Sequence, residues 1–382
     1  MIKVFQTGDN HFGLKFNRYP DIKDQLVQAR LTSLQNAVRL AESQACDLFV
    51  VTGDLFDTVT VAKKLVKQVV EVLAQFSGTV LILPGNHDYY AEGASVWEHY
   101  ASVQPEVGGD LVLLNRFEPY EFDFNGQHLT VYPAYCQSKH SEENNLGWIK
   151  EQPLGEIPGW KIGVAHGAIQ GVTPDLNQEY FLMSPQELEA LDVDAWLIGH
   201  THIPYPALTD ADQSALETGR VYNAGTHEQT DLANNTSGLG FVITLDDAAG
   251  AKRVSARAVR TGQLAFADLP VDVRPDADDA LEQAIRAAVS DLDPRSTIVR
   301  LSVSGSCRQV EYEGRKRLYE DLLGGFLSHE VRDTDLSEQV TMEKISDEFP
   351  SVSLAYQLLQ ELQDDPKELQ MAYELLVQSK AE

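Results

Sequence analysis

Five short apolar runs within the first 200 residues each end in a cluster of polar residues, and this pattern constrains the fold more than any other feature. The clusters read GDNHFG, GDLFD, GNHD, AHG and GHTH. The runs have the length of buried strands, and helix-period segments separate the first three. In layered α/β folds, the loops that follow parallel strands meet at one edge of the sheet. The sequence therefore predicts one site built from all five clusters.

The first part of the chain alternates strand and helix patterns, which implies parallel neighbouring strands covered by helices. The predicted strands span 2–5, 48–51 and 80–83, and the predicted helices span 24–45 and 59–76. Shorter apolar runs at 128–132, 162–165 and 195–198 predict a second, more antiparallel sheet. The expected class is α/β.

The remainder of the chain suggests a smaller appended unit. A hairpin is predicted at 241–245 and 253–259, a crossover at 269–275, a helix at 278–289 and a strand at 298–303. Pro366 is expected to start the last helix. With 43% hydrophobic residues in 382, the chain can bury one large core and a second small one. We expect a core domain over 1–265, a small α/β capping domain over 266–340 and a helical segment over 341–382.

Neither membrane insertion nor disulfide bonding is expected. No stretch approaches the roughly 18 to 20 apolar residues of a membrane-spanning helix, and Met1 leads directly into a predicted strand. The three cysteines, Cys46, Cys136 and Cys307, are too widely spaced for a disulfide framework or a zinc finger. These features predict a soluble cytoplasmic protein.

The net charge of -28 counts against indiscriminate nucleic-acid binding. Residues 251–317 nevertheless hold 12 Lys+Arg against 10 Asp+Glu. In this basic band Arg253, Arg257 and Arg260 occur among apolar residues on a predicted strand and could contact phosphates, joined by further cations at 308 and 315–317. The alternative is a solvated face that balances nearby acids.

Carboxylate, imidazole and carboxamide groups dominate the five clusters. They suit divalent ions such as Mn²⁺, Fe²⁺ or Zn²⁺, and the lack of thiolates argues against a closed structural zinc site. Two ions about 3.5 to 4 Å apart can hold a phosphate and activate water. A ligand shared by both must be an anionic carboxylate. Asp54 is the candidate, because the preceding Gly53 allows the backbone to approach closely.

In their order and residues, the five motifs resemble those of the calcineurin-like metallophosphoesterases. That resemblance implies a layered α/β/β/α core with two mixed sheets flanked by helices. It also implies two ligand sets: Asp9, His11, Asp54 and His202 for one ion, and Asp54, Asn86, His166 and His200 for the other. His87 resembles the family histidine that contacts the scissile phosphate and protonates or stabilises the leaving oxygen, with Asp57 or Asp88 supporting it. A histidine suits this role because it titrates near neutral pH.

A narrower resemblance is to the SbcD-type DNA repair nucleases and their YhaO-like relatives. It rests on TGDNHFG and on VYNAGTH at 221–227, where Asn223 replaces a common proline. It implies a Mn²⁺-dependent DNA exonuclease with some single-strand endonuclease activity, a homodimer and an SbcC-type coiled-coil ATPase partner. His227 is then a candidate substrate contact, although a loop-ordering role suits it equally. The C-terminal helices, from about residue 352, could dock the ATPase or pack against the cap.

Two other functions fit the same residues. A phosphodiesterase or phosphatase for small nucleotides or phosphoproteins would not be hindered by the strong negative charge. A metal-free interaction scaffold is the alternative from another class, but the chain retains all seven ligand residues that such a scaffold would be expected to lose.

Overall fold

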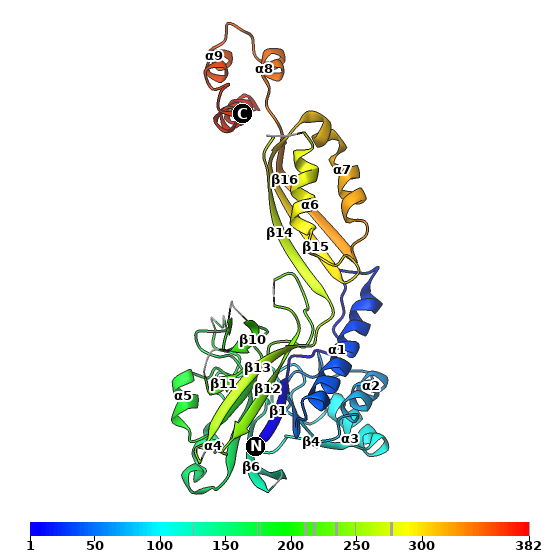
Figure 1. Cartoon of the computed structure of the whole chain (residues 1–382), viewed down its shortest axis with the longest axis vertical. Helices are drawn as coiled ribbons and strands as arrows, with labels where there is room; N and C mark the ends of the chain where they lie inside the picture. Colours follow the sequence, from blue (N-terminus) through cyan, green and yellow to red (C-terminus); the bar gives the residue numbers. More distant parts are fainter. Residues whose placement is uncertain are drawn as a thin grey trace. The chain divides into compact units, whose positions relative to one another are not determined.

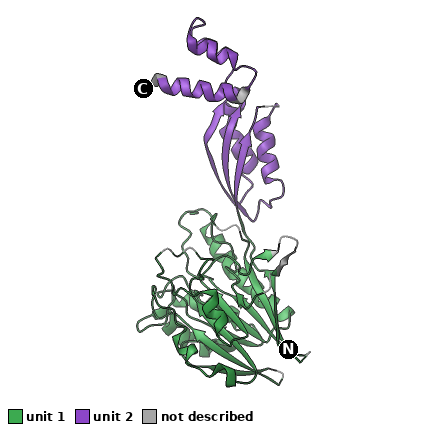
Figure 2. Ribbon diagram, turned by 90° about the vertical axis from the view of Figure 1, so that its left-hand side faces the viewer, with its two compact units in different colours: residues 1–266 green, residues 267–382 purple. Residues whose placement is uncertain are grey.

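The chain forms two compact units, residues 1–266 and 267–382, coloured separately in Figure 2. A computed structural model describes residues 1–124, 126–173, 175, 177–209, 212–216, 219–233, 236–248, 250–275 and 278–381. The division into three domains, with boundaries after residues 265 and 340, stays a prediction.

The larger sheet of the first unit has eight strands in the order β4-β3-β2-β1-β12-β13-β10-β9. Its strands are β1 (Ile2–Thr7), β2 (Leu48–Val51), β3 (Thr79–Ile82), β4 (Asp110–Leu113), β9 (Leu208–Thr209), β10 (Asp212–Leu216), β12 (Leu239–Asp246) and β13 (Arg253–Arg260). Strands β1 to β4 are parallel to one another, which the alternating pattern predicted for β1 to β3. Strand β12 is antiparallel to both β1 and β13, so the predicted hairpin is also present.

The smaller sheet has the order β11-β8-β7-β6-β5. Its strands are β5 (Tyr120–Phe124), β6 (Gln127–Ala134), β7 (Trp160–His166), β8 (Ala195–Gly199) and β11 (Val221–Tyr222). The prediction of a more antiparallel sheet was wrong, because only β5 and β6 pair in that way. The long connections after β6 and β7 return the chain to the same edge before the next strand starts, which makes those strands parallel.

Helices flank the two sheets to give four layers, α/β/β/α (Figure 1). Helices α1 (Lys23–Ser43), α2 (Lys63–Leu73) and α3 (Ser95–Val107) cover the larger sheet, and α4 (Gly147–Lys150), a 3-10 turn (Leu154–Glu156) and α5 (Pro185–Ala190) cover the smaller one. Strand β2 shows how the layers form: Phe49 and Val51 face the helices, while Leu48 and Val50 face the other sheet. Both faces of such a strand are buried, which explains its continuous apolar sequence.

The second unit is built on the sheet β14-β15-β16. Its elements are β14 (Ala265–Val273), α6 (Ala280–Val289), β15 (Thr297–Cys307), α7 (Gln309–Leu323), β16 (Ser328–Glu338), α8 (Met342–Glu348), α9 (Leu354–Glu361) and α10 (Pro366–Ala381). The crossover predicted at 269–275 was wrong for its first five residues, since Val271 and Val273 alternate into the core as part of β14. Pro366 starts α10 as expected. In the described parts of the chain, no helix has the length and apolarity needed to cross a bilayer.

Gln6 on β1 joins the two sheets of the first unit. Its side chain is fully buried, and its Nε2 donates to the carbonyl oxygens of Ile198 (3.2 Å) and Tyr222 (2.9 Å) in the smaller sheet. Both acceptors lie near the carboxyl ends of their strands. The sheets are therefore held together by a polar contact as well as by apolar packing.

Replacement of Gln6 by Leu should lower the free energy of unfolding by about 1 to 3 kcal/mol, because buried carbonyl groups lose donors. Urea unfolding followed by tryptophan emission measures this change, since Trp97, Trp148, Trp160 and Trp196 all lie in the first unit. Gln28→Leu, at an exposed position on α1, is the control and should shift stability by less than about 0.5 kcal/mol. Equal shifts in the two variants would contradict the role of Gln6.

Candidate metal centre

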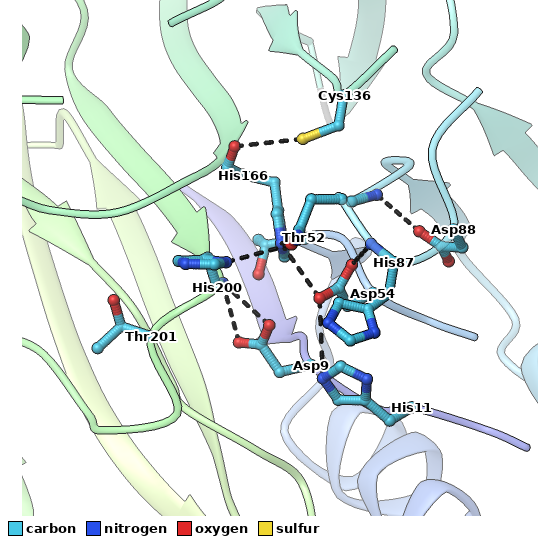
Figure 3. Close-up of polar contacts among 12 residues, drawn as sticks. Asp9, His11, Thr52, Asp54, His87, Asp88, Cys136, His166, His200 and Thr201 are labelled. Carbon is cyan, nitrogen blue, oxygen red and sulfur yellow. Dashed lines mark hydrogen bonds and ion pairs between the residues drawn. The ribbon is translucent and has the colours of Figure 1, made fainter. Parts of the chain in front are cut away.

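The five polar clusters converge at the carboxyl ends of five strands (Figure 3). Asp9 and His11 follow β1, Asp54 follows β2, Asn86 follows β3, His166 ends β7, and His200 and His202 follow β8. These strands are parallel within each sheet and end at matching levels, with Thr7 paired to Val51 and Val51 paired to Ile82. The predicted edge-of-sheet site is thus formed by side chains that are up to 193 residues apart in the sequence.

The candidate ligands form two groups around Asp54. The ligand atoms of Asp9, His11 and His202 lie within 4.8 Å of one another, and so do those of Asp54, His166 and His200. Asn86 joins the second group, since its Oδ1 is 3.0 Å from His166 Nε2 and 3.2 Å from His200 Nδ1. All seven predicted ligands are therefore brought together.

Four of these residues have backbones in the left-handed region. The φ angles are 49° at Asp9, 45° at His11, 50° at Asp54 and 97° at His200. Such conformations are strained for residues with a side chain and concentrate at functional sites. The His200 amide donates to both oxygens of the Asp9 carboxylate, at 2.9 and 3.1 Å, which ties two of these turns together.

Two glycines make room for the ligands. A Cβ at Gly53, where φ is +98°, would lie 2.1 Å from His166 Nδ1, and one at Gly85 would lie 2.2 Å from Asp54 Oδ1. Both distances are far below van der Waals contact. The space left by the missing side chains is occupied by the ligand residues themselves, so Gly53 permits the close approach of His166 in particular.

Hydrogen-bond partners orient the histidine rings. His166 Nδ1 donates to the Thr52 carbonyl at 2.8 Å, and His11 Nδ1 lies 3.4 Å from Asp57 Oδ1. In each ring Nε2 is left to face the cluster, an arrangement typical of metal-ligating histidines. Asp57 also affects His87, because its backbone carbonyl accepts from His87 Nδ1 at 3.1 Å.

Asp88 joins the loops that follow β2 and β3. Its fully buried carboxylate accepts from the amides of Gly85 (2.7 Å) and Phe56 (2.9 Å). The expected support for His87 from Asp57 or Asp88 thus takes two forms: Asp57 binds the ring through its main chain, and Asp88 secures the loop that carries it.

The buried charges shift one another's pKa values strongly. Burial opposes ionisation of Asp54, but the charges of His166 and His11 hold the pKa of Asp54 well below its usual range. Burial also disfavours protonation of His166, yet the Asp54 carboxylate raises the pKa of His166 to about 9. Burial, together with the Asp54 charge, raises the pKa of Asp9 to about 7. Without cations, the cluster therefore retains protons at neutral pH.

The donor set fits divalent cations. Burial lowers the pKa of His200 to about 3 and that of His202 to about 4, so both imidazoles are neutral at pH 7, as metal coordination requires. The other donors are carboxylate and carboxamide oxygens and the Nε2 atoms of His11 and His166. This chemistry matches Mn²⁺, Fe²⁺ or Zn²⁺.

His227 is fully buried and so offers no exposed surface for a substrate contact, which was one of its two candidate roles. Its Nε2 donates to the Arg30 carbonyl at 2.9 Å, and its ring lies 5.5 Å from that of Phe12. Burial lowers the pKa of His227 well below its usual range, which keeps the ring neutral. These contacts fit the other candidate role of His227, which is to order the loop that carries it.

The arginines of β13 do not gather at the metal centre. Arg253 pairs with Asp246, the last residue of β12, which places it level with the beginning of β1, two strands away, and far from the site at the end of β1. Arg257 hydrogen-bonds the side chain of Gln44 after helix α1. Arg260 pairs with Leu239, at the end of the ladder that is nearer to the metal centre. The sequence pattern placed the three arginines on one strand but did not show which end of that strand lies nearer to the metal centre. Eight strand residues span roughly 25 Å, so the two ends have different surroundings.

Most cations of the basic band are paired with acids. Those that form ion pairs are Lys252, Arg274, Arg286, Arg300, Arg308, Arg315, Lys316 and Arg317. Arg315 and Lys316 share Asp333 as their partner, each at 2.9 Å. The arrangement favours the alternative of a face on which cations balance nearby acids.

Arg30 is a residue of the site that the sequence analysis missed. It is 2% exposed, and its guanidinium donates to the backbone carbonyls of Asn10 (3.0 Å from Nε) and Asp9 (3.5 Å from Nη2). It therefore supports the strained turn that carries Asp9 and His11. The sequence does contain a signal for its burial, because Arg30 lies in the apolar stripe of α1 between Leu26 and Leu34.

Comparison with known proteins places this site in a family. The family model for calcineurin-like phosphoesterases matches residues 2–204. No curated protein sequence matches the chain significantly.

Several solved structures are similar at low sequence identity. The calcineurin-like phosphoesterase YfkN from Bacillus subtilis is 12% identical, with a TM-score of 0.39 over 68% of this chain and 89% of that one. TT1561 of Thermus thermophilus is 14% identical, with a TM-score of 0.38 over 66% and 98% of the two chains. A dimetal phosphatase from Danio rerio is 10% identical, with a TM-score of 0.37 over 68% and 98%.

The family model covers more than half of the chain and ends just beyond the last of the seven clustered side chains. Its span includes β1 to β3, β7 and β8, the strands that position the donors. The chain belongs to the calcineurin-like phosphoesterase family and is a metallophosphoesterase.

Proposed function

We propose that this protein is a phosphodiesterase that uses two divalent cations, with Mn²⁺ the expected metal, to hydrolyse DNA. Asp9, His11, Asp54 and His202 would hold one cation, and Asp54, Asn86, His166 and His200 the other. Bound cations of this kind supply Lewis acidity, which neutralises phosphate charge and lowers the pKa of water.

The position of the Asp54 carboxylate carries the proposal. Its Oδ2 lies 3.7 Å from His11 Nε2 in the first group and 3.3 Å from His166 Nε2 in the second. One oxygen atom thus lies close to donors of both groups. A buried carboxylate in that position needs positive charge on both sides, which supports its assignment as the shared ligand.

His87 is the proposed catalytic residue that acts on the leaving oxygen. Its amide donates to Asp54 Oδ1 at 2.8 Å, and its ring lies edge-on to His11 with centroids 4.7 Å apart. Because Nδ1 faces the Asp57 carbonyl, Nε2 is free to reach a phosphate ester held at the cluster. The residue is half-buried, so part of its surface remains accessible.

DNA is proposed as the substrate on the resemblance of TGDNHFG and VYNAGTH to SbcD-type nucleases. The second segment lies next to the cluster: Asn223 Nδ2 donates to the Thr201 carbonyl between His200 and His202, at 2.7 Å. A role in DNA double-strand-break repair or end processing follows from the same resemblance.

The resemblance also leads us to propose a homodimer and an SbcC-type coiled-coil ATPase partner. The C-terminal helices pack on one another through an apolar cluster that includes Ile345 and Leu359. Another part of their surface is apolar and exposed, with Leu354 on α9 and Met371 and Leu375 on α10. Side chains four residues apart on a helix share a face, which is what a helical partner would contact.

Asp54→Ala should lose cations from both positions, whereas His87→Ala should keep both and lose turnover by about 10²- to 10⁴-fold in kcat. Metal analysis after Mn²⁺ loading, combined with kinetics on a phosphodiester, separates these effects. Asp123→Ala and His128→Ala, which remove an ion pair on β5 and β6 outside the site, are matched controls and should change neither quantity. Equal metal loss in the Asp54 and His87 variants would contradict the roles assigned to them, a shared metal ligand and a catalytic residue that binds no metal.

The affinity for Mn²⁺ should rise with pH between about 6 and 9. Asp9, with a pKa near 7, and His166, with a pKa near 9, must lose protons before they can bind a cation, so protonation at low pH competes with the metal. Calorimetry in buffers of different ionisation enthalpy should detect release of about one to two protons per protein at pH 7. Binding that releases no protons and does not depend on pH contradicts these shifts.

Substrate class is tested by incubating the Mn²⁺-loaded protein with an end-labelled duplex, a single strand and an aryl phosphodiester. Cleavage of DNA that stops on addition of EDTA is the expected result. If only the small ester is hydrolysed, the nuclease proposal is wrong and the protein is instead a small-molecule phosphodiesterase.

A further inference from the structure

Three exposed apolar side chains of the first unit, Tyr90, Phe117 and Ile203, lie in loops at the edge of the sheets that carries the metal centre. Among its described residues, the large exposed ones are Met1, Val27, Tyr90, Phe117 and Ile203. Tyr90 lies three residues after His87, and Ile203 comes directly after His202. Exposed apolar groups that lie close together can mark a binding site, whereas scattered ones are normal.

Tyr90 and Phe117 join Tyr135 in what we call the aromatic surface. The three residues occupy loops after β3, β4 and β6, at the same edge as the metal centre. Strand β4 neighbours β3, which carries Asn86, and β6 neighbours β7, which carries His166. Neighbouring strands lie about 4.8 Å apart, so the aromatic surface begins one strand away from the candidate ligands.

Contacts among these loops hold the rings in place. Phe117 stacks on Tyr135 with centroids 4.5 Å apart, and Tyr90 meets Tyr135 edge-on at 6.2 Å. The Tyr90 amide donates to the Cys136 carbonyl at 2.9 Å. Tyr135 is only 5% exposed, whereas Tyr90 and Phe117 are each 36% exposed. The two outer rings are therefore supported by a buried third ring and remain accessible.

A cation belongs to the same loop as Tyr135. Lys139 is exposed, and its backbone carbonyl accepts from Asn86 Nδ2 at 3.3 Å, which brings this residue to the rim of the metal centre. Aromatic rings and cations are the recurring elements of single-strand binding, because every base offers a π face and every nucleotide a phosphate. A phosphoserine or a free phosphate has no ring to place on the aromatic surface.

We propose that the aromatic surface stacks an unpaired nucleobase of a nucleic-acid strand whose neighbouring phosphate lies at the metal centre. The inference rests on the proposed function and adds the part of the substrate that is recognised beside the scissile bond. It makes base stacking, and not the basic band, the source of selectivity for nucleic acid.

Binding to two labelled oligonucleotides of equal length, one of thymidines and one of abasic sites, tests the inference. Fluorescence anisotropy is measured with Mn²⁺ in a His87→Ala background, which keeps the strands intact. Tyr90→Ala and Phe117→Ala should each weaken binding of the thymidine strand about tenfold and leave binding of the abasic strand unchanged. Tyr90→Phe and Phe117→Tyr should restore the preference for bases, because the rings are kept.

Phe124→Ala is the matched control, since Phe124 is a half-buried aromatic that pairs with Gln127 at the opposite end of β6. It should affect neither oligonucleotide. Equal loss of binding for both strands, or no loss for either, overturns the inference, as does a phosphopeptide preference that the same alanine variants abolish. Cleavage of DNA by the wild-type protein tests the proposed function separately, so either idea can fail alone.

Discussion

The buried carboxylate of Asp54 is the group on which the arrangement of the site depends. It approaches His11 and His166 and accepts a hydrogen bond from the His87 amide, so it contacts the loops that follow β1 and β3 and the last residue of β7. An isolated charge at such depth would be strongly unfavourable, and the surrounding imidazoles compensate for it. The same need for positive charge makes the position suitable for cations.

The rest of the fold restrains loops that would not adopt these conformations alone. Left-handed φ angles at Asp9, His11 and Asp54 are unfavourable locally, and they persist because the surroundings determine them. Asp88 binds two amides across two loops, and Arg30 binds carbonyls of the first loop from within α1. Rigid strands beneath the loops then keep the donor atoms at fixed separations, which favours a metal site of defined geometry.

The net charge of this protein opposes the approach of a polyanion, and the basic band offers little compensation. The overall charge of -28 repels polyanions at a distance, and the cations of the basic band are mostly neutralised by adjacent carboxylates. Attraction of a phosphate ester would then depend on the cations held at the cluster. Selectivity among esters would depend on uncharged contacts beside it, such as the rings of Tyr90 and Phe117.

The sequence alone determined the strands β1 to β3, the start of α10 and the identity of the seven clustered side chains, because these depend on local pattern and on residue type. Tertiary structure decided the rest. In the smaller sheet, every neighbouring pair of strands except β5 and β6 is parallel, because the long connections between those strands return the chain to the same edge of the sheet. Residues distant in the sequence determine the burial of His227 and the support that Arg30 gives to Asp9. They also determine that Arg253, on β13, lies at the end of the sheet away from the metal centre. No local pattern specifies such partners, since they are set by which layers pack together.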